Sequence, residues 1–455
     1  MTPQPPSAPE AAVPVLRYES APTRVRYQVM AFLCALSFLT YFDRVCIMRA
    51  RPDIRHDLGI SDAQFGWVMG CFWLAYGLFE IPVGWWGDRF GARRTLARIV
   101  LAWSLFTALS GSATGFLSLL TFRFLFGVGE AGAYPNMARI QSRWLPPRSR
   151  GRAGGLLWLM ARWGGAFSPV IFGTMLRGFA RLEPLTHVAA WRMGFWTSGL
   201  LGLVWVALFY PWFRDDPAEK PSVNEAELAL IRSGRAPGDD AAHPRTPPGM
   251  WAELFTSRSL WALALLYLCG SFGWSFFVSW MPRFLDDVHH VSMRQSEWAS
   301  ALPLFLGGLS CLLGGWLSDA LVRRTGWRRF GRAIFPVVGC TTAAGAMLGL
   351  RFVNSPTQAV VLMCVAAAAY DFGQGANWAS IVDIGGRFAG TALGLINMVG
   401  NMGNFIQPPV GDWVLGAWGW PTMFVVYSGA YLAAGSMWLL IDPRRRFYER
   451  VEVAS

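Results

Sequence analysis

The stretch Gly84-Trp-Trp-Gly-Asp-Arg-Phe-Gly-Ala-Arg-Arg94 follows an apolar run near residues 64–84. Its pattern returns as Gly315-Trp-Leu-Ser-Asp-Ala-Leu-Val-Arg-Arg324, directly after another apolar run near residues 296–318. Both copies place a glycine four residues before an aspartate, and a basic cluster follows the aspartate. This repetition predicts that the chain consists of two related halves.

Apolar runs of about the length of a membrane span extend on both sides of these two loops. A helix needs about 20 mostly apolar residues to cross the hydrocarbon core of a bilayer. We count twelve such runs, near 27–48, 64–84, 95–112, 114–137, 152–176, 190–212, 258–284, 296–318, 332–350, 357–382, 387–414 and 420–441. We therefore expect an all-α membrane protein with twelve transmembrane helices in two pseudo-symmetric six-helix bundles.

The charged, proline-rich segment 214–257 separates the two sets of six runs and is too polar to span a membrane. It predicts a cytoplasmic linker with a short amphipathic helix near Asn224–Arg232. We expect the N-terminal bundle at 25–213 and the C-terminal bundle at 258–443. A Pro- and Ala-rich, disordered tail is expected at 1–24, without a cleavable signal sequence, and a second cytoplasmic tail at 444–455.

The composition supports a membrane protein and argues against a nucleic-acid-binding one. Of the 455 residues, 53% are apolar and 15% are charged, whereas about 25% are charged in soluble domains. The net charge of +12 comes from arginines that lie mostly in short loops on the side of the two termini. Because basic loops stay in the cytoplasm, both termini are predicted to be cytoplasmic, in a protein of the inner cell membrane.

No metal-binding or catalytic pattern is present in the sequence. The seven cysteines form no CxxC pair, and the five histidines form no HExxH motif. A membrane-embedded enzyme would need a metal or nucleophile cluster at membrane depth. We therefore expect no enzyme activity, no metal and no cofactor apart from a proton gradient as driving force.

Ionisable residues inside the predicted spans are the main functional signal. They are Asp43, Arg44, Glu80, Arg123, Glu130, Arg162 and Asp371. Inserting an ionisable side chain at mid-membrane costs about 2.5–3.5 kcal/mol, so each of these residues is expected to have a function or a partner of opposite charge. One alternative is that they form static salt bridges between helices.

The positions of these charges along the helices predict that they lie at two depths in the membrane, one in its outer half and one near its centre. Arg123 and Glu130 are seven residues apart, which places them on one helix face about 10 Å apart and suits two sites on one cavity wall. Asp43 is expected at the depth of Arg123 in the outer half of the membrane. Arg162 is expected near the centre, at the depth of Glu130.

These charges favour proton-coupled uptake of a small organic anion. Arginine binds carboxylates in a bidentate manner, and a buried carboxylic acid can carry a proton across the membrane. Protonation of the acid would release its arginine partner to the substrate. An efflux pump or an uncoupled facilitator for another small solute is the alternative.

The first of the two repeated loops resembles the cytoplasmic signature of the major facilitator superfamily. The resemblance extends over roughly residues 25–443 and implies that Asp88 and Arg89 belong to a gate on the cytoplasmic side. The expected gating residues in the two loops are Gly84, Asp88, Arg89, Gly91, Arg93 and Asp319.

Within that superfamily, three motifs resemble the anion:cation symporter family, which includes bacterial sugar-acid transporters. They are Tyr41-Phe-Asp-Arg44, Arg123-x6-Glu130-x4-Pro135 and the Asn-rich stretch Asn397–Pro408. The resemblance implies that Asp43 and Glu130 carry the proton, that Arg44 binds the substrate carboxylate, and that Arg123 switches between the two acids. It also implies that Tyr41, Tyr76, Asn397 and Asn401 contact the substrate.

Four residues depart from the pattern of that family: Ser149, which replaces the usual acid before Arg150, and Glu80, Arg162 and Asp371. Arg162 is expected to bind substrate and could favour a dicarboxylate, or it could be neutralised by Glu130. The expected partners are a small anionic substrate, protons and the lipid bilayer, with the protein acting as a monomer.

Overall fold

The computed structural model describes residues 20–235, 246–290 and 293–449, without the side chains of 293–300. Most of the expected N-terminal tail, part of the linker and the end of the expected C-terminal tail lie outside these residues. Every regular element within them is a helix. The predicted all-α class is therefore confirmed.

The helices of the N-terminal half are α1 Val25–Leu58, α2 Asp62–Phe90, α3 Ala92–Ser110, α4 Phe116–Glu130, α5 Ala133–Trp144, α6 Arg150–Ala180, the short α7 Glu183–Thr186 and α8 Ala190–Trp212. The segment between the halves contains α9 Glu225–Arg232 and α10 Met250–Thr256. The C-terminal half contains α11 Arg258–Ser275, a π-helical turn Phe276–Trp280, α12 Met281–His289, α13 Met293–Thr325, α14 Arg328–Gly349, α15 Pro356–Phe372, α16 Gln374–Gly385 and α17 Ala389–Ser436. Single 3₁₀ turns lie at Pro147–Ser149, Pro217–Glu219, Leu350–Phe352, Gly386–Phe388 and Met437–Leu439.

Twelve membrane spans follow from these described helices. The fourth span comprises α4 and α5, the seventh runs from α11 to α12, and the tenth comprises α15 and α16. Helix α17 holds the last two spans and turns at Gly419, where φ is 73° and glycine is favoured. Eight described stretches are individually long and apolar enough to cross a membrane, and one of them, Pro356–Leu439, contains three spans.

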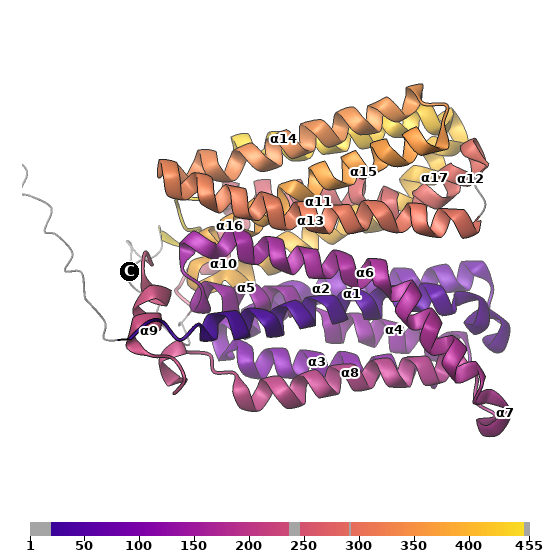
Figure 1. Ribbon diagram of the computed structural model, residues 1–455, viewed down its shortest axis with the longest axis horizontal. Coiled ribbons are helices and arrows are strands. Elements are labelled where there is room, and N and C mark those ends of the chain that lie inside the picture. The colour runs from indigo at the N-terminus through magenta and orange to yellow at the C-terminus, as the bar shows by residue number, and fades with distance from the viewer. Residues whose placement is uncertain (1–19, 236–245, 291–292, 450–455) are drawn as a thin grey trace, which may run out of the picture.

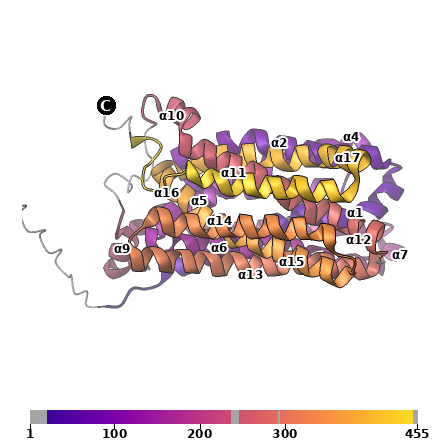
Figure 2. The same ribbon diagram turned by 90° about the horizontal axis from the view of Figure 1, so that it is seen from above.

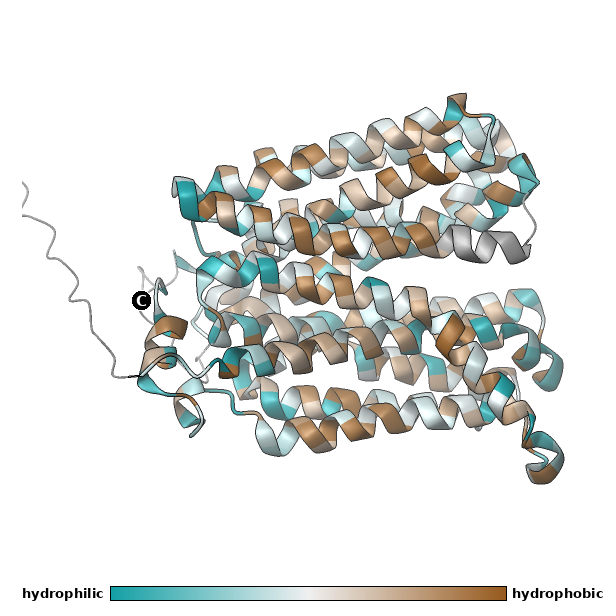
Figure 3. Ribbon diagram, viewed as in Figure 1, coloured by the Kyte–Doolittle hydropathy of each residue, from teal (hydrophilic) through white to brown (hydrophobic). Residues whose placement is uncertain are grey.

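The two halves lie side by side as two parallel layers (Figure 1). Figure 2 shows the same molecule from above, and Figure 3 shows hydrophobic residues through the middle of both layers and hydrophilic ones at their ends. Helices α9 and α10 and the described ends of the chain lie at one end of the bundles, which we call the linker end. Helices α7 and α12 lie at the opposite, distal end.

The fourth span is not the continuous helix that residues 114–137 predicted. It breaks after Glu130, because Gly132 has a φ of 80° and packs against helix α2. A Cβ atom at Gly132 would lie 2.4 Å from Val83 Cγ1. Only glycine combines this backbone conformation with so close an approach.

The tenth span is interrupted at Gly373, which, unlike Gly132, keeps a right-handed helical backbone with a φ of −81°. Helix α15 ends at Phe372 and α16 begins at Gln374. Between them, Gly373 packs on α14, where an added Cβ would lie 2.6 Å from Pro336 Cα. The two halves therefore interrupt corresponding spans with a glycine.

Candidate functional site

A cavity of about 60 Å³ lies between the two halves and is lined by residues of both. Its N-terminal side has Tyr41, Arg44, Tyr76, Tyr134, Trp158 and Arg162, and its C-terminal side has Tyr267, Ser271, Trp274, Tyr370, Gln374, Asn397, Gly400, Asn401 and Asn404. The N-terminal half thus supplies both guanidinium groups, and the C-terminal half supplies four side-chain amides. Guanidinium, amide and hydroxyl groups together suit a small anion that also carries hydroxyl groups.

Arg44 and Glu130 form a buried ion pair within the N-terminal half. Arg44 Nε donates to Glu130 Oε1 at 2.9 Å and to Oε2 at 3.0 Å. The guanidinium lies 4.2 Å from the centre of the Tyr76 ring and 5.3 Å from that of Tyr41, which adds cation–π contacts. Arg44 lines the cavity and Glu130 lies behind it.

Neither Arg123 nor Glu130 lines the cavity, so their predicted placement on one cavity wall is wrong in this structure. The Arg123 side chain is 2% exposed, and its guanidinium packs 4.9 Å from the ring centre of Phe126. Arg123 Nε and Nη1 have no hydrogen-bond partner among the described residues, and neither has Oδ1 of the buried Asp43. Asp43 and Arg123 remain close enough to interact electrostatically, as their predicted common depth requires.

Arg162 pairs with Asp371 and not with Glu130, so the expectation that Glu130 could neutralise it is wrong. Arg162 Nε donates to Asp371 Oδ2 at 2.8 Å, and Nη2 donates to Oδ1 at 2.7 Å. Glu130 is already occupied by Arg44. Depth along a helix indicated which charges share a level, but the packing of the halves decided which of them meet.

Glu80 is fully buried beside the amide-rich wall of the cavity. Asn397 Nδ2 lies 3.5 Å from Glu80 Oε1, and Asn401 Nδ2 donates to the Asn397 carbonyl at 2.8 Å. Glu80 Oε2 has no hydrogen-bond partner among the described residues. Tyr41, Tyr76, Asn397 and Asn401 all line the cavity, and their contact with substrate stays a prediction.

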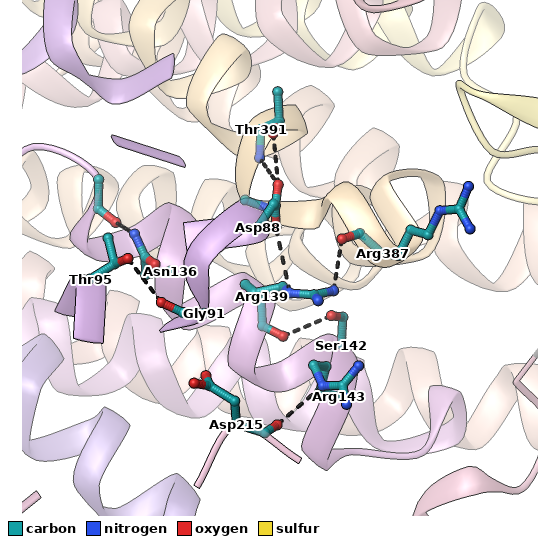
Figure 4. A network of polar contacts seen from close by, with 12 residues as sticks. Asp88, Gly91, Thr95, Asn136, Arg139, Ser142, Arg143, Asp215, Arg387 and Thr391 are labelled. Atoms are coloured by element: carbon teal, nitrogen blue, oxygen red, sulfur yellow. Dashed lines mark hydrogen bonds and ion pairs between the residues drawn. The ribbon is translucent and has the colours of Figure 1, made fainter. Parts of the chain in front are cut away.

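The two repeated loops lie at the linker end, where each aspartate binds the N-terminus of a helix from the other half. Asp88 accepts hydrogen bonds from the Gly390 and Thr391 amides and from Thr391 Oγ1 at the start of α17 (Figure 4). Asp319 accepts from the Gly151 and Arg152 amides at the start of α6. A carboxylate at a helix N-terminus is favoured by the helix dipole and by the free amide groups.

Each of these aspartates also has a buried arginine beside it. Arg139 Nε lies 3.7 Å from Asp88 Oδ1 and donates from Nη1 to the Arg387 carbonyl (Figure 4). Arg332 Nη1 lies 2.7 Å from Asp319 Oδ1. Arg139 and Arg332 could not be predicted from the repeated loops, because each lies more than ten residues beyond its aspartate along the chain.

Glycines let the helices meet at these two contacts. A Cβ at Gly84 would lie 2.5 Å from the Gly390 carbonyl oxygen, and a Cβ at Gly315 would lie 2.2 Å from that of Gly151. The linker end of the cavity is therefore closed by two equivalent contacts between the halves. Gating by these residues stays a prediction.

The other predicted gating residues lie outside these contacts. Arg93 binds the start of the linker and the end of α8, since its amide donates to Asp215 Oδ1 and its Nε donates to the Tyr210 carbonyl. Arg89 forms no hydrogen bond or ion pair within the described part of the chain, and its guanidinium lies 5.9 Å from the ring centre of Phe90. Gly91 has a φ of 94° at the end of α2.

The linker helix α9 is attached to the first span through Glu227. Its carboxylate accepts hydrogen bonds from Thr23 Oγ1 and from the Val25 and Arg26 amides, and it pairs with the Arg26 guanidinium at 2.9 Å. Burial alone would raise the pKa of Glu227, but these donors and the Arg26 charge outweigh it and hold the pKa below its usual value. Glu227 thus caps α1 from the linker.

A signal in the sequence that pointed to the cavity was missed. Glu130 stands two residues before Gly132 and six before Asn136, and Asp371 stands two residues before Gly373 and six before Asn377. The same acid–glycine–asparagine spacing therefore marks the break in both halves. The aromatic lining residues such as Trp158 and Trp274 gave no such signal, because aromatic side chains inside a span usually pack against neighbours.

A family model described as the Major Facilitator Superfamily matches residues 33–407. The chain belongs to the Major Facilitator Superfamily. This is a superfamily of membrane transporters, so the expected fold and the absence of an enzyme function agree with it. The resemblance noted in the sequence is confirmed.

Relatives and solved structures agree with this assignment. The "Probable sulfoacetate transporter SauU" of Cupriavidus necator is 31% identical over 92% of this chain and 94% of the relative. The "Probable galactarate/D-glucarate transporter GudP" of Bacillus subtilis is 29% identical over 93% of each chain. The structure of the proton:xylose symporter XylE has a TM-score of 0.71 at 14% identity, covering 95% of this chain and 99% of that one, which shows the shared fold.

Proposed function

We propose that this protein imports a small organic anion, such as a sugar acid, together with protons, by alternating access across the inner cell membrane. The observation that carries the proposal is the Arg44–Glu130 pair at the cavity between the halves. The guanidinium reaches the cavity, and the carboxylate holds it from behind. The names of the relatives, which refer to organic anions, support this class of substrate.

The pair suggests how proton and anion binding are coupled. While Glu130 is ionised, it neutralises Arg44 and competes with the substrate carboxylate. Protonation of Glu130 removes its negative charge, so the Arg44 guanidinium is left for the substrate. Asp43, which is buried near Arg123, would take a second proton in the same half of the molecule.

The proposed direction follows from the closed linker end. By the positive-inside rule, the arginine-rich loops support a cytoplasmic location for the linker end. The Asp88 and Asp319 contacts close that end, so in this conformation a substrate would enter from the distal, external side. Opening these contacts would release the substrate into the cytoplasm.

The test is uptake into proteoliposomes with an imposed inward proton gradient, using radiolabelled sulfoacetate and D-glucarate. We expect accumulation above equilibrium in the wild type, which Asp43→Asn or Glu130→Gln abolishes. Asp57→Asn is the matched control, because Asp57 pairs with Arg192 at the distal end and is 38% exposed.

Two results would contradict the proposal. Accumulation retained in both Asp43→Asn and Glu130→Gln would remove these acids from proton coupling. Uptake by the wild type that only equilibrates, with or without the gradient, would indicate an uncoupled facilitator.

A further inference from the structure

The Arg162–Asp371 pair is unlike the Arg44–Glu130 pair, because it joins the two halves of the molecule. Arg162 lies in α6 of the N-terminal half, and Asp371 lies in α15 of the C-terminal half. Two parallel hydrogen bonds of 2.8 and 2.7 Å connect them, and the side chains are 4% and 1% exposed. Removing one partner of such a pair would leave the other charge buried and uncompensated, so the two residues have to be tested together.

The surroundings hold the two side chains in place. An added Cβ at Gly307 of α13 would lie 2.4 Å from Asp371 Oδ2, so the glycine leaves the room that the carboxylate occupies. The Arg162 guanidinium lies 4.5 Å from the ring centre of Trp274 and 5.2 Å from that of Trp158. Aromatic faces and a fixed carboxylate leave the guanidinium few alternative positions.

One edge of this guanidinium is left for a ligand. Asp371 occupies Nε and Nη2, whereas Nη1 has no hydrogen-bond partner in the described part of the chain. Arg162 lines the cavity and Asp371 does not. Arg44 also lines the cavity, and Glu130 binds it through Nε alone.

We propose that Arg162, positioned by Asp371, binds a second acidic group of the substrate, so that the cavity selects compact organic dianions over monoanions. This inference rests on the proposed function and names its substrate class. Two guanidinium groups face a single cavity, and each has its own carboxylate on the side away from the cavity. A monoanion satisfies one of them, whereas a molecule with two acidic groups satisfies both.

The amides opposite complete the site. Asn397, Asn401, Asn404 and Gln374 line the C-terminal side of the cavity and carry both donors and acceptors. They suit hydroxyl groups between two acidic ends, or the further oxygens of a bulky acidic group. The volume of about 60 Å³ favours a short molecule and requires the walls to adjust to a longer one.

The experiment compares matched mono- and dianions on the purified, full-length protein by isothermal titration calorimetry. The first pair is D-glucarate and D-gluconate, which share a six-carbon chain and differ in the second carboxylate. The second pair is sulfoacetate and acetate. We expect the dianion of at least one pair to bind the wild type about 10-fold or more tightly than its monoanion, because it makes one additional charge-assisted contact.

Two variants test whether Arg162 is responsible. The double variant Arg162→Gln, Asp371→Asn removes both charges and so leaves no unpaired charge in the membrane interior. We expect it to weaken binding of the dianion, so that the dissociation constants of the two anions of the preferred pair differ by no more than about 2-fold. Arg162→Lys with Asp371 retained keeps the charge and removes the planar fork, so an intermediate preference is expected. The lysine variant keeps the test valid if the double variant fails to fold.

The control is Arg150→Gln with Asp383→Asn. Arg150 Nη1 lies 2.6 Å from Asp383 Oδ1, so this pair also joins α6 to the C-terminal half, but it does not line the cavity. We expect its removal to leave the preference for the dianion unchanged.

The outcomes separate the two proposals. Equal binding of mono- and dianions by the wild type, or a dianion preference that survives both Arg162 variants, would overturn this inference and leave anion import standing. If no anion of either pair binds, the proposed function fails and the inference fails with it.

Discussion

The interrupted fourth and tenth spans each contain an arginine-bound acid two residues before a glycine, but the arginine comes from a different half of the molecule in each case. Glu130 of the fourth span binds Arg44 of its own half. Asp371 of the tenth span binds Arg162 of the other half. The first pair can open and close while the halves stay in place, whereas the second depends on how the halves sit against each other.

This difference between the two pairs is consistent with different roles for them in transport. A pair within a half suits exchange of a proton for a substrate carboxylate. A pair between the halves suits recognition of a ligand by both halves together. Each of the following experiments breaks one side of the comparison and leaves the other intact.

Arg44→Gln should have the largest effect, because it leaves Glu130 buried without its partner. Losing one member of a buried ion pair costs about 3–5 kcal/mol, so we expect uptake in proteoliposomes to fall about 100-fold or more for mono- and dianions alike. Arg162→Gln combined with Asp371→Asn, which leaves no unpaired charge, should affect dianions selectively in the same assay. Equal losses on both substrates in the two variants would erase the distinction between the pairs.

Asp319→Asn and Asp88→Asn compare the two contacts at the linker end. We expect transport to fall about 10-fold in each, with the protein still inserted in the membrane, because the helix N-terminus and a buried arginine lose a full charge. The loss should be larger for Asp319, since Arg332 lies 2.7 Å from it and Arg139 lies 3.7 Å from Asp88. Unchanged initial rates of uptake in both variants would remove the aspartates from gating.

Gly84→Ala and Gly315→Ala test whether the two closing contacts are equivalent. The added methyl groups would lie 2.5 and 2.2 Å from facing carbonyl oxygens, so both variants should close the linker end poorly. We expect transport rates about 5-fold lower in each, in line with an overpacking cost of about 1–3 kcal/mol. Gly345→Ala is the control, because nothing lies within 4 Å of its added Cβ, and a comparable loss there would show a general effect on the fold.

Glu227→Gln should have the smallest effect, and it should depend on pH. The folded protein holds the pKa of Glu227 below its usual value, so its stabilising contribution is present above the unfolded pKa of about 4.3 and is lost as the pH falls through the folded pKa. We expect the variant to melt about 1–2 °C lower than the wild type at pH 7, with the gap closing below about pH 4. Glu225→Gln, on the exposed face of the same helix, should melt like the wild type at both pH values.

Much of the architecture could be read from the chain without its structure. The apolar runs predicted twelve spans in two halves because each span must satisfy its backbone hydrogen bonds internally, which leaves a local signal in composition. The two breaks escaped prediction, because the positive φ of Gly132 and the close packing of Gly373 on α14 are set by the tertiary structure. The acid–glycine–asparagine spacing that marks both breaks was present in the sequence and becomes meaningful once the halves are aligned.

The features of the site also divide into those determined by the sequence and those decided by the tertiary structure. The sequence alone determined which residues carry charge inside the membrane, because an ionisable side chain in an apolar run is costly and visible by itself. Only the tertiary structure decided that Arg162 meets Asp371, that Arg123 lies away from the cavity, and that Arg139 and Arg332 stand beside the two aspartates. Ion pairs form over a few ångströms in space between residues up to 233 positions apart in the chain, so spacing along one helix does not select their partners.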